Sequence, residues 1–189
     1  MTAIRNGKSF DTSMGYTPLA GLIMGTRSGD LDPSVVTAML DRNPAMTAKE
    51  LDTTLNKESG LQGISGDSDM RAVEQRAEKG DEKAQLALDM AAYRLAKYVG
   101  GYHVAVGGAQ ALIFTAGIGE NSPEFREQVC NELGALGIKL DPELNASPEG
   151  EVARISTPES AIEVLVIGTD EERAIADATA SLVRERVKK

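Results

Sequence analysis

The 189 residues include 29 Asp and Glu against 20 Lys and Arg, for a formal net charge of −9, and 41% of them are hydrophobic. That length fits one domain or one and a half, large enough to bury about 70% of the surface that the unfolded chain exposes. The negative balance, with no cluster of basic residues, argues against binding to nucleic acid or to an anionic membrane surface.

The chain opens with a predicted β-hairpin. Strands over residues 2–5 and 8–12 flank Asn6-Gly7, a pair suited to the positive φ angles of a two-residue turn. Because Met1 leads almost directly into a strand, we expect a sheet edge that lacks a preceding strand. Residues 15–32, rich in Gly, Thr, Ser and Pro, predict a loop that ends at the N-cap Asp32 before a helix-initiating proline.

Four helices are predicted next. The second opens with a capping box formed by Thr47 and Glu50 and is ended by Gly60. The fourth repeats alanine and leucine at helical spacing, which permits close packing on a sheet. The predicted bounds are residues 33–40, 47–60, 69–80 and 81–106, with a Gly/Ser-rich loop at residues 63–68.

The second half alternates strands with helices. A short apolar run at residues 111–115 predicts a buried strand, because it is too short for a helix and is bounded by glycine. The remaining predicted elements are a helix through about Leu133, strands at residues 152–156 and 163–167, and a last helix at residues 170–187. This order predicts an α/β fold in which helices cover a mixed sheet.

The strongest local motif is the stretch Ala-Gly-Ile-Gly-Glu-Asn at residues 116–121, directly after the strand at residues 111–115. Glycines let the backbone approach a ligand, and the following helix, capped by Ser122, offers free N–H groups to polar or anionic groups. A plain strand-to-helix turn also favours Gly, Ser and Pro, and a short Gly-x-Gly is weak evidence alone. The residues by themselves leave both interpretations open.

Three further motifs place charged side chains in loops or at helix starts. Arg27, in a Gly/Ser loop, could bind phosphate or carboxylate oxygens with its forked guanidinium, or could pair with Asp30 or Asp32. Asp69 could equally serve a helix N-terminus. The acids at residues 170–172 could hold Mg²⁺ together with nucleotide phosphates, or could be ordinary capping residues.

Cys130 and His103 are the only residues of their types. A single thiol makes neither an internal disulfide nor a zinc site, and we expect Cys130 to be buried and inert. His103 has no nearby Ser, Cys or carboxylate, so a structural or exposed position is expected. The polar start of the chain and the absence of an apolar run of about 20 residues predict a cytoplasmic protein.

Taken together and in this order, the motifs closely resemble the acetate kinase family. The resemblance runs essentially from Met1 to the last helix. It rests on residues 3–15, 17–19, 24–30, 69–71, 114–122 and 164–167. It implies an actin-like (ribonuclease H-like) ATPase fold, with residues 1–189 as a C-terminal nucleotide-binding domain that is truncated at its N-terminal edge.

The resemblance also implies roles for particular residues. Arg27 corresponds to an arginine that stabilises the transferring phosphoryl group, and Glu171 to a magnesium-binding glutamate. The implied contacts to ATP or ADP come from Asp69, Met70, Arg71, Gly117, Ile118, Gly119, Glu120 and Asn121.

Members of that family are about twice as long as this chain. Their N-terminal half supplies a magnesium-binding Asn, a carboxylate-binding arginine, an aspartate and a histidine, and a His-Leu-Gly-Asn-Gly loop precedes the first strand. The resemblance therefore implies transfer of phosphate from ATP to acetate, giving ADP and acetyl phosphate, with this chain as a nucleotide-binding half that is inactive alone. The alternatives are a non-catalytic nucleotide-binding module and a kinase for propionate or butyrate. A homodimer is expected, because the family dimerises largely through this half.

Overall fold

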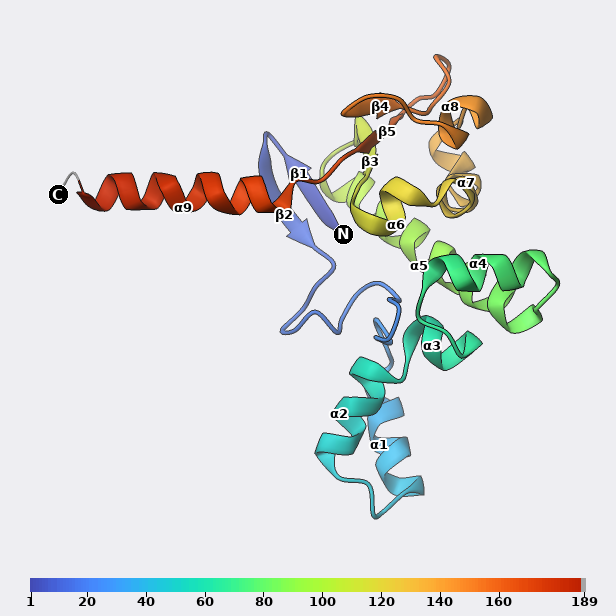
Figure 1. Ribbon diagram of the computed structural model, residues 1–189. Coiled ribbons are helices and arrows are strands. Elements are labelled where there is room, and N and C mark those ends of the chain that lie inside the picture. Colours follow the sequence, from blue (N-terminus) through green and yellow to red (C-terminus); the bar gives the residue numbers. More distant parts are fainter. Residues whose placement is uncertain (188–189) are drawn as a thin grey trace.

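The computed structural model describes residues 1–187, except for the side chains of Glu171, Glu185 and Val187. Figure 1 shows the elements, which are β1 (Thr2–Arg5), β2 (Lys8–Thr12), α1 (Pro33–Arg42), α2 (Ala48–Lys57), α3 (Gly60–Ser65), α4 (Met70–Glu78), α5 (Glu82–Ala105), β3 (Ala111–Phe114), α6 (Ala116–Asn121), α7 (Pro123–Glu132), the 3-10 turn η1 (Gly134–Leu136), α8 (Pro142–Ala146), β4 (Val152–Arg154), β5 (Glu163–Ile167) and α9 (Glu171–Val187). The predicted elements are present in the predicted order, with α3, α6, η1 and α8 as additional short helical turns.

The strands form a mixed sheet and a separate hairpin. β5 lies in the middle of the sheet, parallel to β3 and antiparallel to β4. Leu112 of β3 lies opposite Val164 of β5, and both are buried. The hairpin of β1 and β2 turns at Asn6 and Gly7, whose φ angles of 53° and 72° are those the sequence predicts for this turn. The predicted α/β class with a mixed sheet is confirmed.

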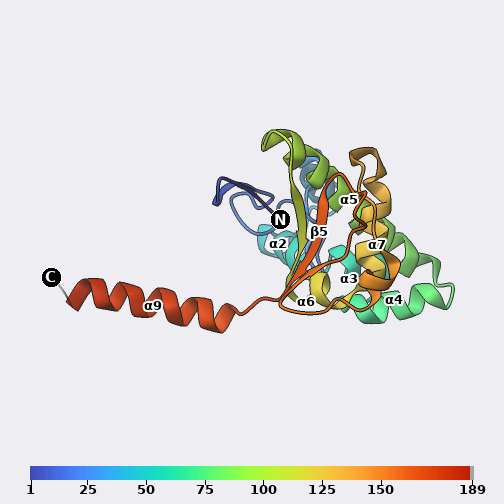
Figure 2. The ribbon, with the colours of Figure 1, turned by 90° about the horizontal axis from the view of Figure 1, so that it is seen from above.

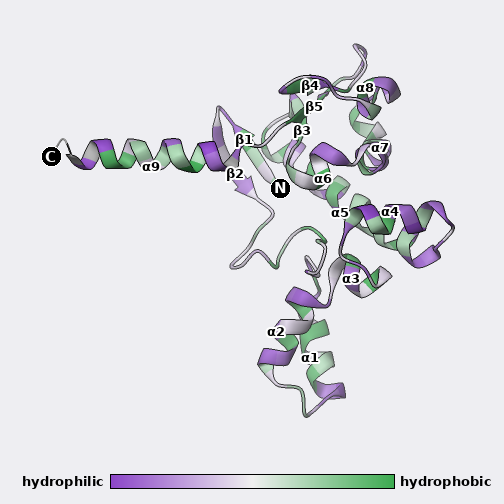
Figure 3. Ribbon diagram, viewed as in Figure 1, coloured by the Kyte–Doolittle hydropathy of each residue, from purple (hydrophilic) through white to green (hydrophobic). Residues whose placement is uncertain are grey.

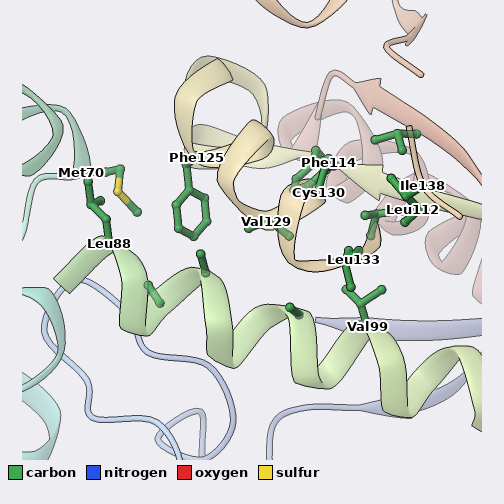
Figure 4. Close-up of a cluster of buried hydrophobic side chains, with 14 of the residues drawn as sticks. Met70, Leu88, Val99, Leu112, Phe114, Phe125, Val129, Cys130, Leu133 and Ile138 are labelled. Atoms are coloured by element: carbon green, nitrogen blue, oxygen red, sulfur yellow. The ribbon is translucent and has the colours of Figure 1, made fainter. Parts of the chain in front are cut away.

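The core lies between the sheet and α5. Figure 4 shows α7 packed between β3 and α5, with Phe125 and Val129 of α7 facing α5 and Phe114 extending from β3. α5 presents small side chains to this contact, which lets the elements approach closely. Its buried residues are Ala84, Ala87, Leu88, Ala91, Ala92, Ala96 and Val99. Cys130 lies in the same cluster, and burial raises the pKa of its thiol to about 12, as expected for an inert cysteine.

Two loop predictions are corrected, because a helical turn includes part of one predicted loop and all of the other. Gly60 was expected to end a helix but begins α3, which includes part of the predicted loop at residues 63–68. The Ala-Gly-Ile-Gly-Glu-Asn stretch was expected to be a loop but forms α6. Helices this short gain little from their own hydrogen bonds, so tertiary contacts determine them and local sequence signals do not.

The last helix extends away from the rest of the molecule (Figures 1 and 2). Apolar and polar residues alternate around α9 (Figure 3), and Ile175, Leu182 and Val183 are exposed. Between residues 1 and 187, no helix is both long enough and apolar enough to span a membrane. His103, near the end of α5, accepts a hydrogen bond at Nδ1 from the Ala109 N–H, which is a structural role.

Candidate functional site

The loop that carries Arg27 is held by backbone hydrogen bonds to the segment around α3. The Met24 N–H donates to the Arg27 carbonyl, which closes the loop at 3.1 Å. The Leu61 N–H donates to the Met24 carbonyl and the Ser59 N–H to the Thr26 carbonyl, each at 3.0 Å. Arg27 therefore projects from a backbone that is fixed before any ligand arrives.

Gly60 makes this close approach of two backbones possible. Its φ is +62°, and a Cβ built there would lie 2.1 Å from the Met24 carbonyl oxygen and 2.6 Å from that of Arg27. Any side chain would push the Arg27 loop away, so only glycine fits. The sequence predicts Gly60 only as a helix terminator, because the close approach of the Arg27 loop depends on residues that are distant in the chain.

The side chain of Arg27 does not pair with either of the two carboxylates considered for it. Asp32 caps α1 by accepting the Ser34 N–H, and Asp30 lies 3.6 Å from Nη1 of Arg94. Among the described residues, the one hydrogen-bond contact of the half-buried Arg27 guanidinium is from Nη1 to Sδ of Met24 at 3.8 Å. Most of its donors remain available for an anionic group.

Asp30 instead ties the Arg27 loop to α5. Its carboxylate accepts hydrogen bonds from the Gly21 N–H at 2.8 Å and from the Tyr98 hydroxyl at 2.5 Å. Burial acts to raise the pKa of Asp30, but these hydrogen bonds and the charge of Arg94 together hold it below its usual value. The same hydrogen bond raises the pKa of Tyr98 to about 12. Residues 68 positions apart form this contact, so no local motif predicts it.

A groove of about 580 Å³ lies beside this network. Its charged and aromatic lining residues include Asp11, Asp30, Asp32, Arg94, Lys97 and Tyr102. Three carboxylates face two cations there, and Arg94 is already engaged by Asp30. This charge balance is unsuited to phosphate, so we do not include the groove in the candidate site.

The start of α4 lies next to the Arg27 loop. A Cβ on Gly25 would lie 2.8 Å from the carbonyl oxygen of Ser68, the residue before Asp69. Asp69 caps α4 through the Arg71 N–H and pairs with the Arg71 guanidinium at 3.0 Å, both side chains being exposed. The side chain of Met70 points into the core beside Leu88 (Figure 4), so only its backbone is available to a ligand.

Glu74 links α4 to the junction of α6 and α7. Ser122 donates a hydrogen bond from Oγ to the Glu74 carboxylate and accepts one from the Phe125 N–H, which caps α7. Burial raises the pKa of Glu74 above its usual value, and the nearby charges of Glu124, Glu78 and Asp69 add to the rise, against the Ser122 hydrogen bond.

The glycine-containing stretch forms an exposed short helix. Ala116 starts α6 with a φ of +60°, and among the described residues nothing lies within 4 Å of a Cβ built on Gly117. Gly119 packs against β3, where a Cβ would lie 3.1 Å from Phe114. The Asn121 side chain donates to the Gly117 carbonyl at 2.9 Å. Gly117 therefore leaves an open face on which a ligand could lie against the backbone.

Glu120 connects α6 to the start of α9. Its carboxylate accepts hydrogen bonds from the Thr169 hydroxyl at 2.8 Å and the Thr169 N–H at 3.0 Å, and these lower its pKa. Asp170 accepts the Arg173 N–H, which is the helix-capping role considered for it. The side chain of Glu171 lies outside the described residues. Elsewhere in the described part of the chain, no three His, Cys, Asp or Glu side chains gather as a metal site.

The four predicted motifs are therefore neighbours in a continuous series of contacts. The Arg27 loop touches Ser68, α4 reaches α6 through Glu74 and Ser122, and α6 reaches α9 through Glu120 and Thr169. None of the bridging residues Ser68, Glu74 and Thr169 was a predicted site residue, because each has an ordinary local sequence environment.

Comparison with known proteins gives matches along the whole chain. The model of the Acetokinase family matches residues 1–177. An acetate kinase of Kocuria rhizophila is 78% identical over 188 residues, which cover 100% of this chain and 46% of that protein. An acetate kinase of Micrococcus luteus is 62% identical, with 97% of this chain and 48% of that protein covered. The chain thus spans about half the length of the curated relatives it matches.

Solved structures give the same result for the fold. The crystal structure of Porphyromonas gingivalis acetate kinase matches with a TM-score of 0.89 and 44% identity, covering 96% of this chain and 46% of that one. A propionate kinase from Francisella tularensis matches with a TM-score of 0.84 and 44% identity, covering 90% of this chain and 43% of that one. These similarities confirm the predicted actin-like ATPase fold.

Proposed function

Because the chain belongs to the acetokinase family, we propose that it forms the nucleotide-binding half of an acetate kinase, which transfers the γ-phosphoryl group of ATP to acetate. The observation that carries the proposal is the 78% identity to a protein named acetate kinase over the full chain. The products are ADP and acetyl phosphate. The proposed location is the cytoplasm, where ATP is available.

Arg27 is the residue proposed to act on the transferring group. Phosphoryl transfer is catalysed mainly by positioning and by stabilising the charge on the transferring oxygens, which a guanidinium does well. The fixed backbone around Arg27 supports this role, as do the guanidinium donors that have no partner among the described residues, since little reorganisation is needed when the charge develops.

The nucleotide is proposed to lie along α6 and the start of α4. The exposed face over Gly117, with Ile118 and Asn121 beside it, supports contact with the adenosine part of ATP or ADP. Asp69 and Arg71 are exposed at the adjacent start of α4, whereas Met70 would contribute through its backbone. Gly119 and Glu120 are engaged with β3 and Thr169, so we assign them to holding α6 in shape around that contact.

Magnesium is proposed to be held at the start of α9. The acidic residues at the start of this helix offer carboxylate oxygens, which suit a hard cation such as Mg²⁺. Glu171 would supply one of these oxygens. When bound, the ion neutralises charge on the phosphates. The remaining ligands would come from the nucleotide and water.

Nucleotide binding without turnover is the expected result for the purified chain. A fluorescent ADP analogue with Mg²⁺ measures affinity, and hydroxylamine trapping of acetyl phosphate measures turnover. Gly117→Val places a side chain on the open face and should weaken ADP binding at least about tenfold, roughly 1.4 kcal/mol. Gly134→Val is the matched control, because Gly134 is also open but lies in η1.

Each outcome bears on a different part of the proposal. A folded chain that does not bind ADP would overturn it. If the chain does show turnover and Arg27→Ala abolishes it, the role of Arg27 is supported. That result would also show that this half is sufficient for activity on its own. ADP binding without turnover would leave a non-catalytic nucleotide-binding module as an alternative. Turnover in a full-length protein that contains these residues would exclude that alternative.

We favour acetate over a longer acid, because the relatives of 78% and 62% identity are both named acetate kinases. The propionate kinase matches this half with the same 44% identity as the acetate kinase from P. gingivalis, so selection between acids is assigned to residues outside this half.

A homodimer is also proposed. α5 exposes a second apolar stripe opposite its buried face, formed by Leu86, Met90 and Tyr93 at helical spacing. An exposed stripe on a helix that also packs into the core is the pattern of a helix shared between the core and an interface.

A further inference from the structure

Arg126 is a fully buried cation whose role the site residues do not explain. It lies in α7 and its side chain is 1% exposed. Within the described residues, its hydrogen bonds reach only carbonyl and amide oxygens, and it has no ion pair with a carboxylate. Burying a guanidinium costs free energy unless its N–H groups are well hydrogen-bonded. The partners of these N–H groups therefore indicate what Arg126 does in the fold.

The guanidinium joins α8 to the end of α6. On one side, Nε donates to Oδ1 of Asn145 at 2.8 Å and Nη2 donates to the Asn145 carbonyl at 2.6 Å. On the other side, Nη1 donates to the carbonyls of Gly119 at 2.9 Å and Glu120 at 3.0 Å. Asn145 is itself buried and fixed, since its Nδ2 donates to the Pro123 carbonyl at 2.8 Å.

α6 needs such external support. It has six residues, too few for stability on its own, and it begins with Ala116 in a left-handed conformation that non-glycine residues rarely adopt. In the described structure the Thr115 side chain makes no capping hydrogen bond at its start. The last carbonyls of a helix lack partners within the helix, and Arg126 supplies the partners for two of them.

We propose that Arg126 is a positioning residue that holds α6 in the conformation in which it meets the nucleotide. This inference rests on the proposed nucleotide-binding function. Arg126 is too buried to contact the ligand itself, so it acts through the backbone of Gly119 and Glu120. Without the hydrogen bonds from Arg126, α6 would become ordered only when the nucleotide binds, and the free-energy cost of that ordering would reduce the affinity for the nucleotide.

Arg126→Lys tests this role, because lysine keeps the charge but replaces the planar fork of donors, which reaches α6 and α8 through different nitrogen atoms, with a single ammonium. The full chain should bind the fluorescent ADP analogue about tenfold more weakly than wild type. Hydrogen exchange of the ligand-free chain should become faster in residues 116–121. Val129→Ala is the control: it also removes buried contacts from α7, but Val129 makes no bond to α6 and should leave ADP affinity and α6 exchange unchanged.

The role is overturned if folded Arg126→Lys retains either wild-type ADP affinity or wild-type exchange in α6, or if Val129→Ala changes them equally. If Arg126→Lys fails to fold, Asn145→Ala is the deciding variant. Faster hydrogen exchange confined to α6 would then support the role of Arg126, and unchanged exchange in α6 would overturn it. A wild-type chain that does not bind ADP overturns the proposed function and with it this role. Tight ADP binding that Arg126→Lys leaves intact overturns this role alone.

Discussion

Charged residues of the candidate site differ in whether their charge is already engaged. Asp69 and Asp170 accept hydrogen bonds from helix N-termini, and Glu120 accepts two from Thr169. The guanidinium of Arg27, by contrast, donates a hydrogen bond only to a thioether sulfur among the described residues. A side chain with unused donors on a rigid loop is suited to a ligand that supplies the missing acceptors, which favours Arg27 as the group that meets phosphate.

Gly60 should be the most sensitive glycine around Arg27. Gly60→Ala is expected to destabilise the chain by about 2 kcal/mol or more, because a positive φ costs a non-glycine residue about 1–2 kcal/mol and the Cβ also collides with Met24. Urea denaturation measures the loss. Gly66→Ala is the matched control, since Gly66 has a φ of +85° but an open Cβ position in the described structure. Equal losses in the two variants would contradict the close approach.

Glu74 should make stability depend on pH. Burial raises its pKa in the folded chain, so the protonated form stabilises the fold below the unfolded pKa, about 4.3, and this contribution is lost as pH rises through the folded pKa. Glu74→Gln keeps an acceptor for Ser122 without the charge. We expect it to be more stable than wild type at pH 8 by about 0.5–1 kcal/mol, because the variant keeps the hydrogen bond but avoids burying a charge beside other carboxylates.

Urea denaturation at pH 8 and at pH 5 measures this difference, which should shrink at the lower pH. The exposed Glu127 of α7, which is not one of the charges that raise the pKa of Glu74, provides the control. Glu127→Gln should change stability by less than about 0.5 kcal/mol at either pH. If Glu74→Gln proved less stable than wild type at pH 8, the charged hydrogen bond to Ser122 would outweigh the cost of burial.

Elements with strong local signals could be predicted, and those that depend on distant partners could not. Asn6-Gly7, the capping box of Thr47 and Glu50, and the alanine repeat of α5 each specify structure within a few residues, and each is found as predicted. α6 has no such signal. Its left-handed start and its bonds to Arg126 depend on residues that pack only after the chain has folded.

The same distinction holds for the candidate site. The motifs around Arg27, Asp69 and Gly117 are visible in the sequence because each combines glycine or a cap with a charged or open position. Their spatial connection is not visible, because it runs through single contacts such as the one between Glu74 and Ser122, 48 residues apart. The local motifs can therefore be recognised in the sequence, whereas the contacts that join them cannot.

For the whole molecule, α5 both packs into the core and exposes the apolar stripe at which we propose that a second copy binds. One face of α5 packs against α3, α4 and α7, and the opposite face exposes Leu86, Met90 and Tyr93, which are 51%, 42% and 58% exposed. In a two-fold symmetric dimer the same stripe would face its copy, so each apolar residue would be covered by an equivalent one. Burial of that stripe is a physical reason for two copies to associate through α5.

Met90→Glu should therefore separate the dimer. Glutamate is a good helix former, so the isolated chain should fold as before, but association would bury an unpaired carboxylate on each copy. We expect light scattering after size-exclusion chromatography to show a dimer for wild type and at least about tenfold weaker association for Met90→Glu. Gln85→Glu adds the same charge on an exposed part of α5 away from the stripe, where it replaces the exposed hydrogen bond to Asp89 with repulsion, and it should remain dimeric. A monomeric wild-type chain would refute the homodimer. A dimer that Met90→Glu leaves unaffected would refute only the assignment of the interface to α5, because the apolar stripe would then be covered by something other than a second copy.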